Sequence, residues 1–267
     1  MDLGSGLAIF GSAKLVERLL GPTVDYVGEG VKSWTERRVN NVAKIFDNAI
    51  SKLDDKLETS GQVPPRVLKG ILGEGSYCDD DLAREYFGGV LASSRTSKLR
   101  DDRGAVLVSL LGRLSTYQIR SHYIFYHTIR KLYLNLALRP TTSQVRMQLG
   151  TYIPMIMYHQ AMDLDEEEKK DLTIIPHVMY GLQKEGLIEG NFSFGEDAYI
   201  RQFFPPLTEA GIVFTPAILG IELFLWALGR SNVPPSDIFD AKLEFAEFPA
   251  VTIPDGARRL FIPDPPG

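Results

Sequence analysis

The sequence has only one cysteine, Cys78, and no surplus of basic residues. A single cysteine cannot form an internal disulfide or supply the thiolates of a zinc cluster, so the sequence indicates a reducing compartment, the cytoplasm. The net charge is −5 at pH 7, whereas proteins that chiefly bind nucleic-acid phosphates usually carry an excess of lysine and arginine. Nucleic-acid binding is therefore expected, at most, at a local basic patch.

Motifs of known catalysts and cofactor sites are also missing. No Walker loop, GxGxxG, GxSxG or protein-kinase signature occurs in the sequence. His122 and His127 are five residues apart, which separates them by about 140° around a helix, so they cannot chelate one metal ion together. Hence we expect no metal, no cofactor and no enzymatic activity.

Long apolar runs are scarce, and one stretch, residues 212–229, approaches the length of a membrane span. A span needs about 20 apolar residues, and Glu222 would lie near the middle of the bilayer at a cost of a few kcal/mol. Thr215 followed by Pro216 is typical of a helix start, and Gly229 of a helix end. The sequence therefore predicts a buried helix of a soluble domain.

The N-terminal segment does not match a signal peptide, because Asp2 stands where a basic region is expected. The segment is therefore predicted to remain in the mature protein. Its glycines, Gly4, Gly6 and Gly11, are interpreted first as a flexible start of the chain. The alternatives are close contacts between helices in a homo-oligomer or contact with a membrane surface.

Hydrophobic residues at intervals of three and four predict helices throughout residues 1–140. Residues 31–60 have the clearest pattern and are expected to form one long amphipathic helix that ends before Pro64 and Pro65. Several shorter helices follow, the last of them capped by Ser115. Residues 1–140 are therefore assigned to a multi-helix N-terminal domain.

The pattern changes after residue 140, where strand-forming and helix-forming segments alternate. Two helical segments, a hairpin predicted in "LIEGNFSFG" and the apolar helix described above follow one another through residues 141–230. This is the order of a winged-helix-like module. Residues 231–267 form a tail that alternates at Leu243, Phe245 and Phe248, which predicts one or two short strands. The expected fold class is mainly α, and α+β overall.

The segment "RSHYIFYHTIRKLY" (120–133) places many aromatic rings on one side of a helix. These rings are predicted to fill the core between helices instead of forming a reactive centre. Basic residues lie off this stripe, and others are interleaved with acids in the long helix. The candidate surface for a partner protein or a nucleic acid consists of Arg37, Arg38, Arg120, Arg130 and Lys131.

Three consecutive carboxylates, Asp79, Asp80 and Asp81, precede a predicted helix. Negative charge at a helix N-terminus is favourable by a few tenths to about 1 kcal/mol, so we interpret Asp79 or Asp80 as a cap. The alternative is a hidden nuclease or other enzyme that uses these residues, which would need further ligands from elsewhere in the chain.

Four segments together resemble one family, the bacterial abortive-infection alpha (Abi-alpha) proteins. They are "VPPRVLKGIL", "SYCDDDLAREYFGGVLASS", "LLGRLSTYQIRSHYIFYHTI" and "GIVFTPAILGIELFLWALG". The resemblance covers residues 15–230. It departs from the family at Gly88 and Gly89, where a helix former is more usual, and in the tail after residue 230. It implies a role in defence against phage, and it carries over no catalytic residue.

These observations favour an interaction protein of antiphage defence that senses or binds a phage or host protein and triggers growth arrest. Nucleic acid is a less favoured partner, because the helix in "TIIPHVMYGLQKEGL" has one lysine and no arginine. The alternative hypotheses are a nucleic-acid-binding protein and a membrane-associating effector that uses the glycine-rich N-terminal segment on activation. The expected location is the bacterial cytoplasm.

Overall fold

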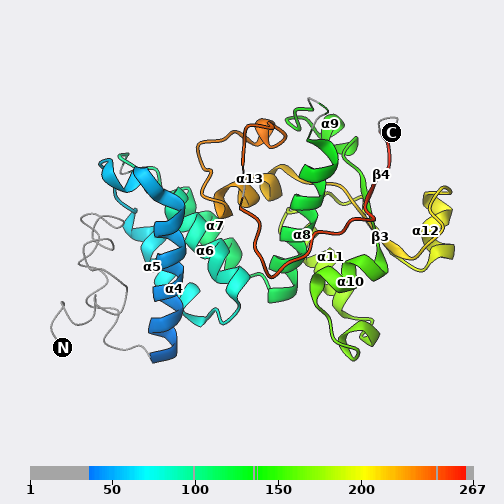
Figure 1. Cartoon of the computed structure of the whole chain (residues 1–267), viewed down its shortest axis with the longest axis horizontal. Coiled ribbons are helices and arrows are strands. Elements are labelled where there is room, and N and C mark those ends of the chain that lie inside the picture. Colours follow the sequence, from blue (N-terminus) through cyan, green and yellow to red (C-terminus); the bar gives the residue numbers. More distant parts are fainter. Residues whose placement is uncertain (1–35, 99, 135, 137, 245, 263–267) are drawn as a thin grey trace. The chain divides into compact units, whose positions relative to one another are not determined.

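The structure, a computed structural model, describes residues 36–98, 100–134, 136, 138–244 and 246–262 (Figure 1). The chain divides into two compact units. Unit 1 holds the described residues up to Leu114 together with Leu225–Asn232. Unit 2 holds Ser115–Phe224 and the described residues from Val233 onward. The first division thus falls at Ser115 and not at residue 140, because the helix that follows Ser115 packs in unit 2.

Unit 1 is built of helices, and its longest is the one expected within residues 31–60. In the described part of the chain this helix, α4, covers Glu36–Leu53 and continues as a 3-10 turn, η4, over Asp54–Glu58. The predicted end is therefore too late for the α-helix itself. The remaining elements are α5 (Pro65–Gly73), η5 (Gly75–Tyr77), α6 (Asp81–Ser93) and α7 (Gly104–Leu111).

Two glycines within α6 allow other backbone segments of unit 1 to approach it closely. A Cβ atom at Gly88 would lie 2.9 Å from the carbonyl oxygen of Ile45 on α4. A Cβ atom at Gly89 would lie 1.7 Å from the carbonyl oxygen of Ala227, which also belongs to unit 1. Glycine replaces the usual helix former at these positions because any side chain would collide with main-chain atoms.

Unit 2 combines helices with a four-stranded antiparallel sheet whose strand order is β2-β3-β1-β4. The expected fold class, mainly α with a small β component, is confirmed at this level. The strands are β1 (Thr151–Pro154), β2 (Ser193–Gly195), β3 (Gly211–Phe214) and β4 (Arg258–Arg259). The helices are α8 (Thr116–Tyr133), α9 (Ser143–Met147), α10 (Met155–Met162), α11 (Ile174–Lys184), α12 (Asp197–Phe203) and α13 (Ile218–Ala227), with 3-10 turns η6 (Glu168–Lys170) and η7 (Pro235–Asp237). The last residues of α13 belong to unit 1.

The strand predictions are partly wrong. The segment "LIEGNFSFG" is not a hairpin, because its strand β2 pairs with β3, which follows α12 in the chain. The tail has its strand at β4, and not around Leu243 and Phe248, where the described residues form no strand. Phe245 lies outside the described residues. Local alternation marks an extended segment, but the partner strand decides whether that segment joins a sheet.

The aromatic stripe of α8 lies in the core, as predicted. Its hydroxyl groups are hydrogen-bonded inside the core: Tyr126 Oη donates to the carbonyl oxygen of Leu187 at 2.6 Å. His122 and His127 are also buried, and rings of α8 and α13 pack against them. The stripe residues, each at most 3% exposed, are Ile119, Tyr123, Tyr126, Ile129 and Tyr133.

The apolar stretch 212–229 is divided between β3 and α13, so the predicted helix begins after Pro216 and the residues before it form a strand. Helix α13 begins at Ile218, two residues after Pro216, and Gly229 follows its end with a φ of 76°. Among the helices that the structure describes, none is long and apolar enough to cross a bilayer. The glycine-rich N-terminal segment proposed for membrane contact lies outside the described residues.

Candidate functional site

An open polar cavity of about 650 Å³ lies in unit 2 at the N-terminus of α8. In it, Ser115 Oγ lies 2.9 Å from Nε2 of His177, a residue of α11. A serine hydroxyl beside a histidine is the first requirement of a nucleophile with its base. The cavity is lined by Ser115, Tyr117, Glu167, Glu168, Asp171, Thr173, Ile174 and His177.

The hydrogen bonds of Ser115 are those of a helix cap. Its Oγ accepts from the backbone N–H of Gln118 at 3.3 Å, and its own N–H donates to Gln118 Oε1 at 2.9 Å. This reciprocal pair is a capping box, so the predicted N-cap is confirmed. The other ring nitrogen of His177 has no hydrogen-bond partner among the described residues, so nothing orients this histidine as a base.

The carboxylates of the cavity are also engaged in local structure. Glu168 accepts a hydrogen bond from Tyr117 Oη, and this bond raises the pKa of the tyrosine. Asp171 accepts from Thr173 through both its N–H, at 2.8 Å, and its hydroxyl, at 2.6 Å. Within the described parts of the chain, no three histidine, cysteine or acidic side chains are arranged to hold a metal ion. The polar side chains around the cavity therefore cap α8, link it to α11 and stabilise the neighbouring turn.

A second candidate is an exposed aromatic cluster, which we call the aromatic face and define as Tyr180, Phe192 and Phe194. The rings of Tyr180 and Phe192 meet edge to face, with centroids 5.2 Å apart. Those of Phe192 and Phe194 are stacked at 6.2 Å. Tyr180, on α11, is 60% exposed, and both phenylalanines are half-buried. Large aromatic rings held in fixed positions at a surface are typical of protein-binding sites.

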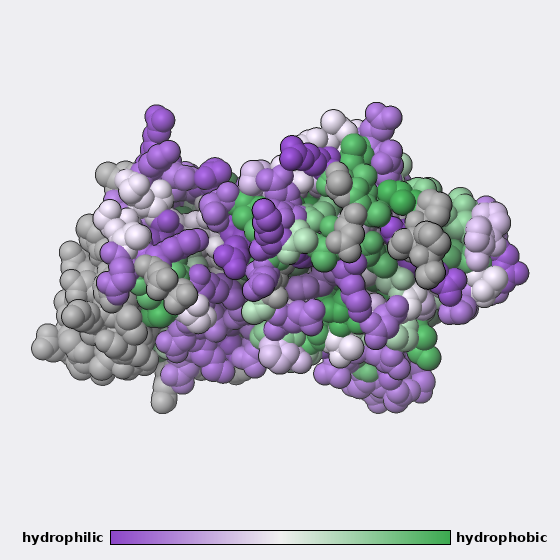
Figure 2. Space-filling view, turned by 45° about the horizontal axis from the view of Figure 1, so that its top comes forward, coloured by the Kyte–Doolittle hydropathy of each residue, from purple (hydrophilic) through white to green (hydrophobic). Residues whose placement is uncertain are grey.

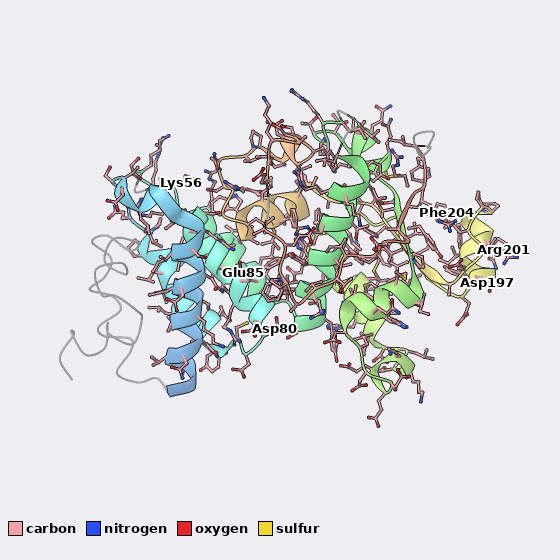
Figure 3. The ribbon with its side chains drawn as sticks, viewed as in Figure 1. Lys56, Asp80, Glu85, Asp197, Arg201 and Phe204 are labelled. Carbon is pink, nitrogen blue, oxygen red and sulfur yellow. The ribbon has the colours of Figure 1, made fainter. Side chains whose placement is uncertain are left out.

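Helix α12, which lies between β2 and β3 in the chain, carries further exposed rings. Tyr199 and Phe203 are 47% and 55% exposed and meet edge to face at 5.2 Å. An ion pair of 2.6 Å joins Asp197 to Arg201 one turn later. These two residues lie on α12, with Phe204 directly after it (Figure 3). Phe204 packs against a buried cluster of the sheet and so attaches the helix to unit 2.

The residues of the predicted basic surface are divided between the two units. Arg38 belongs to unit 1, where its guanidinium group donates to Ser76 Oγ at 3.2 Å and lies 4.0 Å from the ring of Tyr77. Arg37 lies in α4, but its side chain is outside the described part. Arg120, Arg130 and Lys131 belong to α8 in unit 2.

The three basic residues of α8 all bind the tail of the chain. Arg130 donates to three backbone carbonyl groups of the tail, and Arg120 donates to that of Ala250 at 3.1 Å. Lys131 forms a 2.6 Å ion pair with Asp255. The candidate surface on α8 is therefore occupied by a segment of the same chain.

The three aspartates have structural contacts in unit 1. Asp80 is the N-cap of α6 and accepts from the N–H of Ala83 at 2.8 Å, which confirms the prediction of a cap. Asp81 pairs with Arg84, and this bond lowers the pKa of the aspartate. Asp79 accepts from Asn41 at 3.0 Å. Burial raises the pKa of the neighbouring Cys78 thiol to about 11, which makes it a poor nucleophile at neutral pH.

Replacing Asp80 should therefore act through stability alone. In Asp80→Ala the amide of Ala83 loses its acceptor, and we expect unfolding free energy to fall by about 1 kcal/mol. Urea denaturation measures this loss, and Asp80→Asn, which can still cap, should be close to the wild type. A complete loss of phage protection in Asp80→Asn without a change in stability would instead support an enzymatic role.

Comparisons with known proteins give no match. No family model, no curated protein and no solved structure is similar to the chain at a significant level. The resemblance to the abortive-infection alpha proteins rests on the four sequence segments alone and remains a prediction.

Two features of the candidate sites, one in the cavity and one at the aromatic face, were not predicted from the sequence. The pair of Ser115 and His177 joins residues 62 positions apart. The aromatic face has a weak local signal, because Phe192 and Phe194 alternate while Tyr180 lies in an amphipathic helix. Only the register of β2 against β3 and its position beside α11 bring these rings together.

Proposed function

We propose that this protein is an interaction protein of antiphage defence, which binds a phage or host protein through unit 2 and thereby triggers growth arrest. The observation that carries the proposal is the aromatic face on α11 and the β2 segment. The resemblance to abortive-infection proteins supports the setting, and the reducing bacterial cytoplasm is the proposed location. In the polar cavity Ser115 caps α8 and Asp171 holds a turn, so its hydroxyl and this carboxylate have structural roles.

The connectivity of unit 2 supports a winged-helix-like module as the binding element. Helix α8, strand β1, helices α10 and α11, and strands β2 and β3 follow in chain order, and the sheet order is β2-β3-β1. In such modules the helix before the β-hairpin is the one that contacts the partner. Here that helix is α11, and the connection between β2 and β3, which contains α12, takes the place of the wing.

The charge near the aromatic face favours a protein over a nucleic acid. Helix α11 has one lysine, Lys184, and no arginine, and Glu185 follows directly. Arg146 of α9 forms an ion pair with Glu189 at 2.9 Å. Phosphate binding and base recognition both depend on lysine and arginine, whereas aromatic rings without excess charge are typical of protein interfaces. Tight DNA binding that weakens steeply with salt would contradict this choice.

The test is a phage challenge of cells that express variants of the aromatic face. We expect Tyr180→Ser combined with Phe194→Ser to reduce protection at least tenfold, because alanine-scan losses at aromatic anchors are about 2 kcal/mol or more. The matched control is Tyr77→Ser, which replaces a 69% exposed tyrosine in unit 1 and should retain protection. Thermal unfolding of each purified variant separates lost binding from lost folding. Full protection by the stable double variant would contradict the proposal.

A further inference from the structure

The tail, defined here as residues 238–261, is attached to unit 2 almost without regular structure. Among its described residues β4 is the only strand after η7, and most of the side chains are exposed or half-buried. Figure 1 shows it, in orange to red, passing α8 on its way to β4. Its buried anchors are Ile238, Phe239, Val251 and Pro254. The hydrophobic contribution to its attachment therefore comes from few side chains.

Most polar contacts of the tail with α8 involve its main chain. The carbonyl groups of Ile238, Asp240 and Leu243 accept hydrogen bonds from Arg130. The N–H of Phe248 donates to Tyr123 Oη at 2.5 Å. Backbone groups are common to every peptide, so these contacts select an extended chain and place few demands on its side chains.

The end of the tail covers an edge of the sheet. Strand β4 pairs with Thr151 and Tyr152 of β1, and the next amide, that of Leu260, donates to the carbonyl of Gly150 at 2.9 Å. The ring of Phe261 lies where a side chain of residue 150 would be, 2.3 Å from a Cβ atom built there. Without the tail, β1 would be an edge strand, and such edges bind extended peptides by adding a strand.

Charge and exposed apolar groups define what this surface accepts. Between residues 238 and 256 the tail has four acidic residues and one lysine and lies against Arg120, Arg130 and Lys131, and the two arginines of β4, Arg258 and Arg259, follow. Hydrophobic residues reach the surface over the region of α9 and β4 (Figure 2). There Met147 and Phe261 are 43% and 52% exposed. An acidic chain with spaced apolar residues fits these groups.

We propose that the surface formed by α8 and the free edge of β1 is a binding site for an extended acidic peptide segment of a partner protein, with the tail as its built-in occupant. The partner segment replaces the tail by pairing with β1 and accepting the same hydrogen bonds from α8. The site is separate from the aromatic face, so the inference does not rest on the proposed function.

The tail competes with any peptide at a high effective concentration, about millimolar for a short tether. A peptide added to the intact protein therefore has to displace the tail. Substitutions that weaken the contacts of the tail should increase the affinity for the added peptide. The probe is a synthetic peptide of residues 233–262. The full-length variant combines Asp255→Lys, which removes the ion pair with Lys131, with Leu260→Pro, which removes the amide that pairs with Gly150.

Fluorescence anisotropy of the labelled peptide should give a Kd at least tenfold lower for this variant than for the wild-type chain. A scrambled peptide of the same composition should not bind either protein. Equal affinity for the two proteins, or no binding to a variant with native circular dichroism, overturns the proposal. If the double variant does not fold, Asp255→Lys alone replaces it, because the Asp255 side chain is 80% exposed.

A charge exchange identifies the surface that binds. In a full-length variant weakened by Asp255→Ala and Leu260→Pro, whose own tail carries no charge at position 255, Lys131→Glu should weaken binding of the natural peptide, and a peptide carrying Asp255→Lys should recover it. Tyr180→Ser should leave peptide affinity unchanged, which separates this site from the aromatic face. An affinity that is indifferent to residue 131 overturns the assignment to α8.

Discussion

Gly89→Ala should destabilise the protein by about 3 kcal/mol or more, the largest effect we expect from any single methyl group. The added Cβ would lie 1.7 Å from the carbonyl oxygen and 2.2 Å from the carbonyl carbon of Ala227. Both are main-chain atoms, so no side chain can rotate away, and α6 would have to separate from residues 225–232. Alanine is the better helix former by about 1 kcal/mol, which offsets only part of this cost. Urea denaturation measures the difference.

The matched control is Gly73→Ala, at the end of α5. No atom lies within 4 Å of a Cβ built there, so this variant should be as stable as the wild type or gain a few tenths of a kcal/mol. Gly88→Ala should lie between the two, because its closest main-chain atom is 2.9 Å away. Equal stability of Gly89→Ala and Gly73→Ala would contradict the close approach of the two backbones.

Mild acid should destabilise unit 2 through its two buried histidines. Burial lowers the pKa of His122 to about 3 and that of His127 to about 4, and Arg130 contributes to the second shift. His122 Nε2 donates to the carbonyl oxygen of Gly220 at 3.1 Å. His127 Nε2 has no hydrogen-bond partner in the described part of the chain, so a proton added there finds no acceptor. Both side chains are therefore neutral in the folded protein.

The direction of the pH dependence follows from these pKa values. The unfolded chain protonates its histidines below about pH 6.5, whereas the folded chain does so only near pH 3 to 4. The contribution of the two neutral histidines to stability is therefore complete above pH 6.5, and it is lost as the pH is lowered toward 4. At pH 5 each histidine should lower the free energy of unfolding by about 2 kcal/mol, and the two together by about 4 kcal/mol. Chemical denaturation at pH 7.5, 6 and 5 measures this slope.

His122→Gln removes one titrating group and should remove about half of the slope between pH 7.5 and 5. His177→Gln changes an exposed histidine outside the core and should leave the slope as in the wild type. Half-buried His159, whose pKa is also lowered by burial, acts in the same direction and remains in both variants. An unchanged slope in His122→Gln would show that His122 is not held neutral by the fold.

The sequence by itself determined the long helices α4 and α8, the caps of α6 and α8, and the composition of the core, whereas the short helices α9 and α12 were not predicted. Periodicity is a local property, so the stripe from Ile119 to Tyr133 and the caps at Asp80 and Ser115 were predictable from neighbouring residues. The same local rules also indicated that His122 and His127 fill the core. Capping and amphipathic spacing act within one or two turns, and no distant contact overrides them here.

The tertiary structure alone decided strand pairing and the use of the basic residues. A strand of three residues, such as β2, has no preference for a partner until the fold places β3 beside it. Glycine at position 89 was unexplained until Ala227, far along the chain, was seen against it. The sequence predicted that the side chains of Arg120, Arg130 and Lys131 form an exposed surface, yet each of them binds a tail residue at least 108 positions away, and Arg120 also donates to the carbonyl oxygen of Ala161. Contacts over such distances depend on the path of the whole chain, which local spacing does not encode.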